Sequence, residues 1–230
     1  MIFNVLTLYP ELIDEYAKTG VVGRGVKSGI LSINSVNIRD YTLNKHGCVD
    51  DYPYGGGAGM IMMAQPVYDC ITAVRQNKDI PVIFFSPKGR PFTTSIAKEY
   101  IKYSETILLC GHFEGIDQRA LDLCVTDELS MGDYILTGGH LAAMCFIDAV
   151  SRYIPGVLGN EESYADESFE NGLLEHAQYT RPYEFMGLKV PDILLSGNHA
   201  KIQQYKYEQS LAETKKRRPD LFDSAFSKQD

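Results

Sequence analysis

Two short apolar stretches, PVIFFS (residues 81–86) and TILLCG (residues 106–111), decide the fold class of this 230-residue chain. Both are rich in β-branched, aromatic or aliphatic residues, and each is followed by a turn that contains glycine or proline. A strand that is apolar throughout is buried on both faces, which is typical of a parallel sheet covered by helices. The two stretches therefore predict an α/β protein built on a parallel sheet.

The segments around these two stretches alternate between strand-like and helix-like patterns. Further strands are predicted at 2–8, 31–41 and 121–131, and the polar, glycine-rich segment 42–60 is predicted to be a loop. Helices are predicted from Pro10 to residue 22, at 64–77 and at 140–154. The helix at 140–154 is expected to turn four side chains inward: Leu141, Met144, Cys145 and Ile147.

The character of the chain changes at Pro155. Between Pro155 and Tyr179 there is no Lys or Arg, whereas six residues are acidic, which predicts a mobile linker or lid. The segment 201–222 is helical by composition and carries six cationic residues within 18 positions. We therefore expect a catalytic domain at 1–157, a linker at 158–175 and a small C-terminal helical domain at 176–230.

Composition and charge narrow the class of protein. The chain is 44% apolar and 23% charged, as globular proteins are, and no run approaches the ~18 apolar residues of a membrane span. The five cysteines form no CxxC pair, which indicates buried, reduced thiols in a cytoplasmic protein. The net charge of −8 argues against a nonspecific nucleic-acid coat but leaves room for a local basic patch.

The loop YGGGAGM (residues 54–60) has four glycines in five positions. Such a loop bends sharply or approaches another group closely. A phosphate-binding P-loop is excluded because the chain has no Gly-Lys dipeptide, and the dinucleotide pattern GxGxxG also fails here. Two interpretations remain, a loop packed on its own protein and a backbone wall against a planar ligand.

Three further glycine-containing loops follow predicted strands or a strand candidate. They are SPKGRPF (86–92), CGHFEGIDQR (110–119) and MGDYILTGGH (131–140). The carboxyl ends of parallel strands gather at one edge of a sheet, where ligands bind in open α/β folds. Because glycines let several backbones crowd around one ligand, the three loops predict a cofactor pocket.

Six motifs together resemble one family. DDYPYGGGAGM, CGHFEGID, MGDYILTGG, SRYIPGVLG, YTRP and VPDILLSGNH occur in the order and spacing of the bacterial tRNA (guanine-N1)-methyltransferases of the SPOUT superfamily, over nearly the whole chain. The resemblance implies transfer of a methyl group from S-adenosylmethionine to N1 of guanosine 37 of tRNA, 3′ of the anticodon. It also implies a parallel α/β sheet with a C-terminal deep trefoil knot, and a homodimer whose active sites use both chains.

The resemblance assigns the cofactor to the knot loops. Backbone groups of Met131, Tyr134 and Leu136 would bind the adenine, and Glu114 would face the sulfonium. Phe113 stands where the family commonly has tyrosine, so a hydroxyl contact is missing there. The full set of implied cofactor-binding residues is Phe84, Ser86, Pro87, Gly89, Gly111, Phe113, Glu114, Gly115, Met131, Gly132, Asp133, Tyr134, Ile135, Leu136, Gly138 and Gly139.

The chemistry of the implied reaction needs a base and a cation. Methylation at N1 of guanine removes the N1 proton, and negative charge develops on O6. Arg152 matches the family's arginine, and its guanidinium can donate two parallel hydrogen bonds to O6. The family has an aspartate before Ser-Phe where this chain reads YADESF, so the base is either Asp166, which we favour because a linker slips easily by one residue, or Glu167.

The remaining assignments concern the RNA and a metal ion. Gly57 and Gly59 would line the guanine pocket, His199 would cap the C-terminal helix or contact RNA, and Lys215 to Arg218, with Lys215, Arg217 and Arg218 foremost, would meet phosphates. The family resemblance makes Mg²⁺ a possible cofactor, but no HxxxH or CxxC spacing marks a metal site, so any ion would be held by scattered carboxylates or by the ligand. Two alternatives are a catalytically silent RNA-binding module and a phosphotransferase, and the missing Gly-Lys argues against the second.

Overall fold

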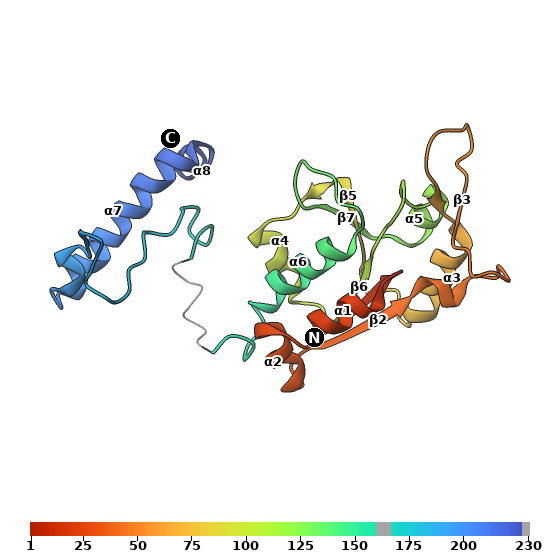
Figure 1. Cartoon of the computed structure of the whole chain (residues 1–230), viewed down its shortest axis with the longest axis horizontal. Coiled ribbons are helices and arrows are strands. Elements are labelled where there is room, and N and C mark those ends of the chain that lie inside the picture. Colours follow the sequence, from red (N-terminus) through yellow and green to blue (C-terminus); the bar gives the residue numbers. More distant parts are fainter. Residues whose placement is uncertain (160–166, 227–230) are drawn as a thin grey trace. The chain divides into compact units, whose positions relative to one another are not determined.

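The structure is a computed structural model that describes residues 1–159 and 167–226, the side chains of 224–226 excepted. The chain divides into two compact units, Met1–Gly159 and Asn160–Asp230, which are described separately (Figure 1).

The first unit is built on a five-stranded sheet in which every neighbouring pair is parallel. The strand order is β2-β1-β6-β5-β7. The strands are β1 (Ile2–Thr7), β2 (Ser32–Asn37), β5 (Val82–Pro91), β6 (Glu105–Leu109) and β7 (Asp127–Ser130). The predicted α/β class with a parallel sheet is therefore confirmed.

Helices cover both faces of this sheet. They are α1 (Pro10–Tyr16), α2 (Gly20–Lys27), α3 (Ala64–Val74), α4 (Thr94–Tyr100), α5 (Gln118–Cys124) and α6 (His140–Ser151). Figure 1 shows α3 beside α5 on one side of the unit and α4 beside α6 on the other. Successive strand residues alternate between the two cores: Leu108 belongs to the core under α4 and α6, and Ile107 and Leu109 belong to the core under α3 and α5.

Several predicted boundaries were wrong for local reasons. The helix expected to run from Pro10 to residue 22 is two helices, α1 and α2. The strand expected at 31–41 ends at Asn37 and continues as the 3-10 helix η1 (Ile38–Tyr41). The strand expected at 121–131 begins only at Asp127, because α5 occupies the first half of that segment.

The start of α5 explains the last of these errors. The side chain of Asp117 accepts a hydrogen bond from the backbone N–H of Arg119 at 3.0 Å, which caps the helix. Its buried residues, Ala120, Leu121 and Cys124, have helical spacing. The cap and this spacing together identify a helix where the apolar content alone had indicated a strand.

The inward face of α6 differs from the prediction. Ile147 is fully buried and Met144 packs partly against the core, as expected, but Leu141 is 43% exposed and Cys145 is exposed. The buried face instead carries Ala142, Ala143, Phe146, Ile147, Val150 and Ser151. Small and large side chains therefore share the buried face of α6. Of the five cysteines, Cys70, Cys110 and Cys124 are buried, and Cys48 and Cys145 are exposed.

The segment 42–60 is a loop, as predicted, except for one short ladder. Strand β3 (Asp50–Asp51) pairs antiparallel with β4 (Ile61–Met62) at the base of the glycine-rich stretch. The ladder closes the loop into a hairpin-like excursion.

The strand β5 makes an excursion beside β7. Leu129 of β7 pairs with Phe85 and again with Arg90, so residues 86–89 leave the ladder and return to it. A Cβ atom on Gly89 would lie 2.5 Å from the backbone nitrogen of Leu129. The excursion therefore passes against the backbone of β7, where only glycine fits.

The second unit is mainly helical. It contains the hairpin strands β8 (Glu184–Phe185) and β9 (Leu188–Lys189), the 3-10 helix η3 (Asp192–Leu195), and the helices α7 (His199–Arg217) and α8 (Pro219–Phe226). Proline 219 starts α8 and ends the single helix that the composition of 201–222 had indicated. The hydroxyl of Thr214, buried in α7, accepts a hydrogen bond from the backbone N–H of Leu174 at 2.8 Å.

Candidate functional site

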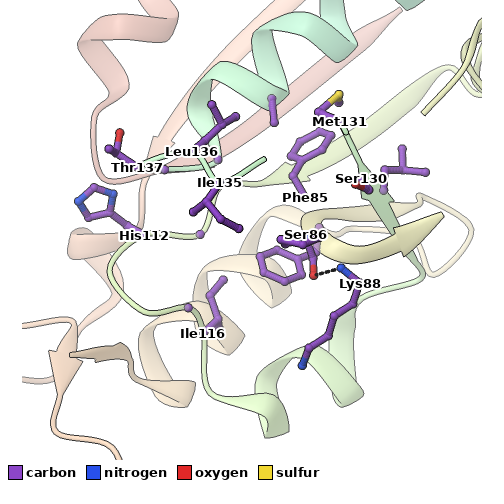
Figure 2. Close-up of a pocket in the computed structure, with 18 of the residues that line it drawn as sticks. Phe85, Ser86, Lys88, His112, Ile116, Ser130, Met131, Ile135, Leu136 and Thr137 are labelled. Carbon is purple, nitrogen blue, oxygen red and sulfur yellow. Dashed lines mark hydrogen bonds between the residues drawn. The ribbon is translucent and has the colours of Figure 1, made fainter. Parts of the chain in front are cut away.

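A pocket of about 550 Å³ opens at the carboxyl ends of β5, β6 and β7. Three loops line it, at 84–88, 111–116 and 129–139 (Figure 2). This is the edge at which open α/β sheets bind ligands, and the volume is in the ~300–1,000 Å³ range of small-molecule sites.

Two of the loops meet through glycine. The backbone N–H of Gly139 donates a hydrogen bond to the carbonyl of Gly111 at 2.8 Å. His112 and Gly138 form an isolated antiparallel β-bridge. A Cβ atom on Gly139 would lie 2.8 Å from the Cα of Cys110, closer than real Cβ contacts come. The absence of a side chain at 139 is therefore what allows these two loops to form one wall of the pocket.

The other loop is held by a serine. The buried hydroxyl of Ser86 accepts a hydrogen bond from the backbone N–H of Lys88 at 3.1 Å, drawn as a dashed line in Figure 2. The ring of Phe84 lies against Gly111, where an added Cβ would be 3.0 Å from it. These contacts fix the start of the excursion from β5 against the loop that follows β6.

The structure brings most of the implied cofactor residues together. All sixteen line the pocket except Gly89 and Asp133. Ten further residues line the pocket. Lys88, His112, Ile116, Gln118 and Thr137 belong to the glycine-containing loops that predicted the pocket, and Phe85 lies within the implied cofactor loop that begins at Phe84. The residues that sequence reasoning missed are Leu121, Leu129, Ser130 and Ala142. Leu129 and Ser130 directly precede Met131, so contiguity with that assigned position was the available signal for these two.

The backbone groups expected to bind adenine already have partners in part. The N–H of Tyr134 donates to the carbonyl of Gly132 at 2.9 Å, and the hydroxyl of Tyr134 donates to the carbonyl of Met131 at 3.2 Å. A carbonyl oxygen has a second lone pair, so Met131 can accept another bond. The Tyr134 N–H would have to exchange its partner.

A cluster of aromatic and imidazole rings lies behind the pocket wall. The hydroxyl of Tyr9 is 3.3 Å from Nε2 of His112, and the Tyr9 ring also meets His140 edge-on. Burial and the neighbouring His112 lower the pKa of His140. Nδ1 of His112 is buried without a hydrogen-bond partner among the described residues. Protonation of His140 is therefore disfavoured, and this ring is held neutral.

The glycine-rich loop at 54–60 approaches the protein itself. Gly59 has φ +84°, and a Cβ on it would lie 2.4 Å from Cγ of Glu114. The backbone N–H of Glu114 donates to the carbonyl of Met60 at 2.9 Å. Gly57 has nothing within 4 Å of its added Cβ, and neither glycine lines the pocket. The loop thus contacts the pocket's acidic residue from outside.

The implied catalytic residues come from the sequences of both units. Arg152 ends α6 as its C-cap, is half-buried and does not line the pocket. Asp166 lies outside the described residues. Glu167 is half-buried and belongs to the second unit.

Several of the implied RNA-binding residues already interact with other side chains of the chain. Asn198, rather than His199, caps α7, because its side chain accepts from the N–H of Lys201 at 3.2 Å, so the capping role expected of His199 was wrong. Arg217 pairs with Glu213, and Arg218 donates two bonds to Asp220 at 2.9 and 2.7 Å. The ammonium of Lys215 lies 5.7 Å from the ring centre of Phe222. Exposed ion pairs of this kind contribute little to stability and exchange readily for a phosphate.

Membrane-spanning helices and metal-ligand clusters are both absent from the residues that the structure describes. None of the helices within 1–159 and 167–226 is both long and apolar enough to cross a membrane. Over the same residues, no three His, Cys, Asp or Glu side chains gather in a way that could hold a metal ion.

Comparison with known proteins identifies the family. The family model for tRNA (Guanine-1)-methyltransferase TrmD matches residues 1–224. A protein of Clostridium perfringens (strain ATCC 13124) named tRNA (guanine-N(1)-)-methyltransferase is 53% identical over 234 residues, covering 100% of this chain and 97% of the relative. A protein of the same name from Clostridioides difficile (strain 630) is 50% identical over 231 residues, covering 99% and 100%.

A third relative extends the similarity beyond the clostridia. The protein of this name from Staphylococcus epidermidis (strain ATCC 35984) is 48% identical over 223 residues, covering 97% of this chain and 91% of the relative. In each of these comparisons, identity near one half extends over almost the full length of both chains. This chain belongs to the tRNA (guanine-1)-methyltransferase TrmD family.

Proposed function

We propose that this chain transfers the methyl group of S-adenosylmethionine to N1 of guanosine 37 of tRNA, 3′ of the anticodon, in the cytoplasm. The observation that carries the proposal is the pocket itself. Its walls are made by the three predicted loops, two of which hold motifs of this family, and these two meet where Gly139 contacts Gly111. Membership of the family supplies the reaction class.

The pocket suits a bent sulfonium donor. Adenine would lie against the backbone of 131–136, where apolar side chains such as Ile135 and Leu136 line the pocket. Backbone groups provide hydrogen bonds without requiring polar side chains, which agrees with the apolar sequence there. Glu114, at another part of the lining, places a carboxylate where it can face the positive sulfur.

The proposed chemistry uses one cation and one carboxylate. Arg152 stabilises the negative charge on O6, and Asp166 or Glu167 accepts the N1 proton. The freed N1 electron pair forms the new N–C bond as the C–S bond breaks, leaving the thioether S-adenosylhomocysteine. No step is assigned to Mg²⁺, because the described residues show no metal cluster.

The identity of the base is tested by two single variants. We expect Asp166→Ala to lose turnover by orders of magnitude and Glu167→Ala to lose little, because a general base contributes roughly 10²- to 10⁴-fold. The reverse pattern would assign Glu167, and small, equal losses would show that neither removes the proton. Single-turnover methylation of tRNA measures the chemical step directly.

We further propose a homodimer and a knotted chain. Arg152 does not line the pocket of its own chain, and α6 exposes Leu141 and Cys145 on one side, which suits a second copy. The knot is proposed from the family resemblance, and the contact between Gly139 and Gly111 supports it only in bringing together loops that are distant in the sequence, as a trefoil knot also does.

The tRNA would be held by both units. We propose that residues 158–175 act as a linker, that the glycines at 57 and 59 border the guanine, and that His199, Lys215, Arg217 and Arg218 contact the RNA. The exposed loop supports this role, since Tyr54 is 99% exposed and free to stack on a base.

A labelling experiment tests the activity. The protein is incubated with tritiated S-adenosylmethionine and two tRNA transcripts that differ only in having guanosine or adenosine at position 37. Transfer of label to the guanosine transcript alone supports the proposal. Binding of tRNA without transfer would instead support a silent RNA-binding module, and transfer to both transcripts would contradict the assigned target.

A further inference from the structure

The pocket carries one ammonium side chain. Among the described residues that line it, Lys88 supplies the single Lys or Arg, and Glu114 supplies the single carboxylate. The other side chains are apolar, aromatic or neutral polar. A pocket that is otherwise so weakly charged gives these two side chains a strong influence on which ligand charges it accepts.

Lys88 is held in place by its backbone rather than by an ion pair. Its N–H donates to the buried hydroxyl of Ser86, and the residue sits in the excursion 86–89 that passes against β7. The residue is exposed, and its ammonium group makes no ion pair or hydrogen bond with another described side chain. The backbone of Lys88 is therefore fixed, and its ammonium charge is not neutralised by another described side chain.

Lys88 lies away from the adenine end of the pocket. In Figure 2, Lys88 and Ile116 lie in the lower half of the view, and Met131 and Leu136 lie in the upper half. A ligand whose adenine contacts 131–136 would extend its other end toward Lys88. For the proposed donor, that other end is an amino acid, with an α-carboxylate and an α-ammonium group.

We propose that Lys88 determines donor binding by forming an ion pair with the α-carboxylate of the methyl donor. Glu114 then faces the positive sulfonium or α-ammonium, so that the two charged side chains match the charges of the ligand. This inference rests on the proposed function, because it assumes that the pocket holds this donor. It assigns a role to a residue that the family motifs did not single out.

Calorimetry with two ligands isolates the contact. S-adenosylhomocysteine has the amino-acid end, and 5′-methylthioadenosine lacks it but keeps the adenine, ribose and sulfur. We expect Lys88→Gln to weaken binding of S-adenosylhomocysteine roughly 3- to 10-fold, as for a partly exposed charge-assisted hydrogen bond, and to leave 5′-methylthioadenosine unchanged. Lys88→Arg should retain most of the affinity, and Lys78→Gln, an exposed lysine outside the pocket lining, should change neither.

The other possible results separate failure of the Lys88 proposal from failure of the proposed function. Equal weakening of both ligands by Lys88→Gln would show damage to the loop and would overturn the proposal, as would unchanged affinity for S-adenosylhomocysteine. Loss of tRNA affinity with donor affinity intact would assign Lys88 to an RNA phosphate instead. If the wild-type protein binds neither ligand, the proposed function itself fails, which is a different result from any of these.

Discussion

At Gly139, one hydrogen atom in place of a side chain allows the loops after β6 and β7 to touch. The contact is a backbone hydrogen bond to Gly111, and any Cβ would collide with the Cα of Cys110. Backbone cannot move aside as a flexible side chain can. The pocket wall therefore depends on a residue that makes no side-chain contact.

A substitution at this glycine tests that dependence. We expect Gly139→Ala to lower the free energy of unfolding by about 1–3 kcal/mol, as overpacking does, and to weaken S-adenosylhomocysteine binding at least tenfold. Gly159→Ala is the matched control, because an added Cβ there has nothing within 4 Å, so stability should stay within about 0.5 kcal/mol. Thermal melts measure the stability of each variant, and calorimetry measures its affinity for S-adenosylhomocysteine. Equal stability and equal affinity of the two variants would show that the pocket does not depend on glycine at 139.

The neighbouring His140 predicts a pH dependence of stability. Its pKa is lowered in the folded protein by burial and by His112, so the unfolded state binds the proton more readily. Its contribution to stability is complete above the unfolded pKa of ~6.5 and is lost as pH falls through that value toward the folded pKa. Between pH 7.5 and 5.5, His140→Gln should therefore lose less stability than the wild type.

The control for this experiment is a histidine on the surface. His46 is exposed, so His46→Gln should leave the pH profile of unfolding unchanged. Urea unfolding at a series of pH values gives the slopes. A wild-type slope identical to that of His140→Gln would show that the imidazole is not held neutral.

At the scale of elements, apolar runs predicted the central strands but not every neighbour. PVIFFS and TILLCG are buried on both faces, so their sequence reports their surroundings directly. The stretch 121–131 was predicted to be a strand because a buried helix end and a buried strand are equally apolar. The capping residue Asp117 is the feature that identifies the helix. On α6, Ile147 lies inward as predicted, but Leu141 and Cys145 are exposed, and the buried face carries other residues, such as Phe146, instead.

Contacts between loops could not be read from the sequence. Each glycine-containing loop of the pocket was visible as a motif, but the contact between Gly139 and Gly111 joins loops that are far apart along the chain. The approach of Gly59 to Glu114 is of the same kind. Such pairings depend on the strand order of the sheet, and neither composition nor the family resemblance indicated which residues would meet.

The basic end of α7 carries a prediction about RNA binding. Arg217 and Arg218 form exposed ion pairs with Glu213 and Asp220, which a phosphate can replace at little cost. The double variant Arg217→Gln, Arg218→Gln should weaken tRNA binding and reduce the slope of log affinity against log salt by about 1–2 units, with donor affinity unchanged. A salt slope equal to that of the wild type, measured by filter binding, would exclude these arginines from phosphate contact.

At the scale of the whole molecule, the net charge of −8 means that tRNA must be attracted locally rather than by the overall field. The chain supplies its proposed catalytic groups from two places: Arg152 in the first unit, and Asp166 or Glu167 in the sequence that the second unit contains. A homodimer that shares its sites would bring these groups to one guanine.

Subunit mixing tests the shared site. Neither Arg152→Ala nor the double variant Asp166→Ala, Glu167→Ala should methylate tRNA alone. If one site takes Arg152 from one chain and its base from the other, a mixed dimer has one intact site, and an equal mixture should recover about a quarter of wild-type activity. Exchange is verified by co-purification through a tag on one variant; verified exchange without recovered activity would place both groups on one chain.

The most direct test of the central claim is a crystal structure of the protein with S-adenosylhomocysteine. We expect the ligand within the pocket that the loops at 84–88, 111–116 and 129–139 line, with adenine against the backbone of 131–136. Density for the ligand at any other place on the chain, with this pocket left empty, would contradict it.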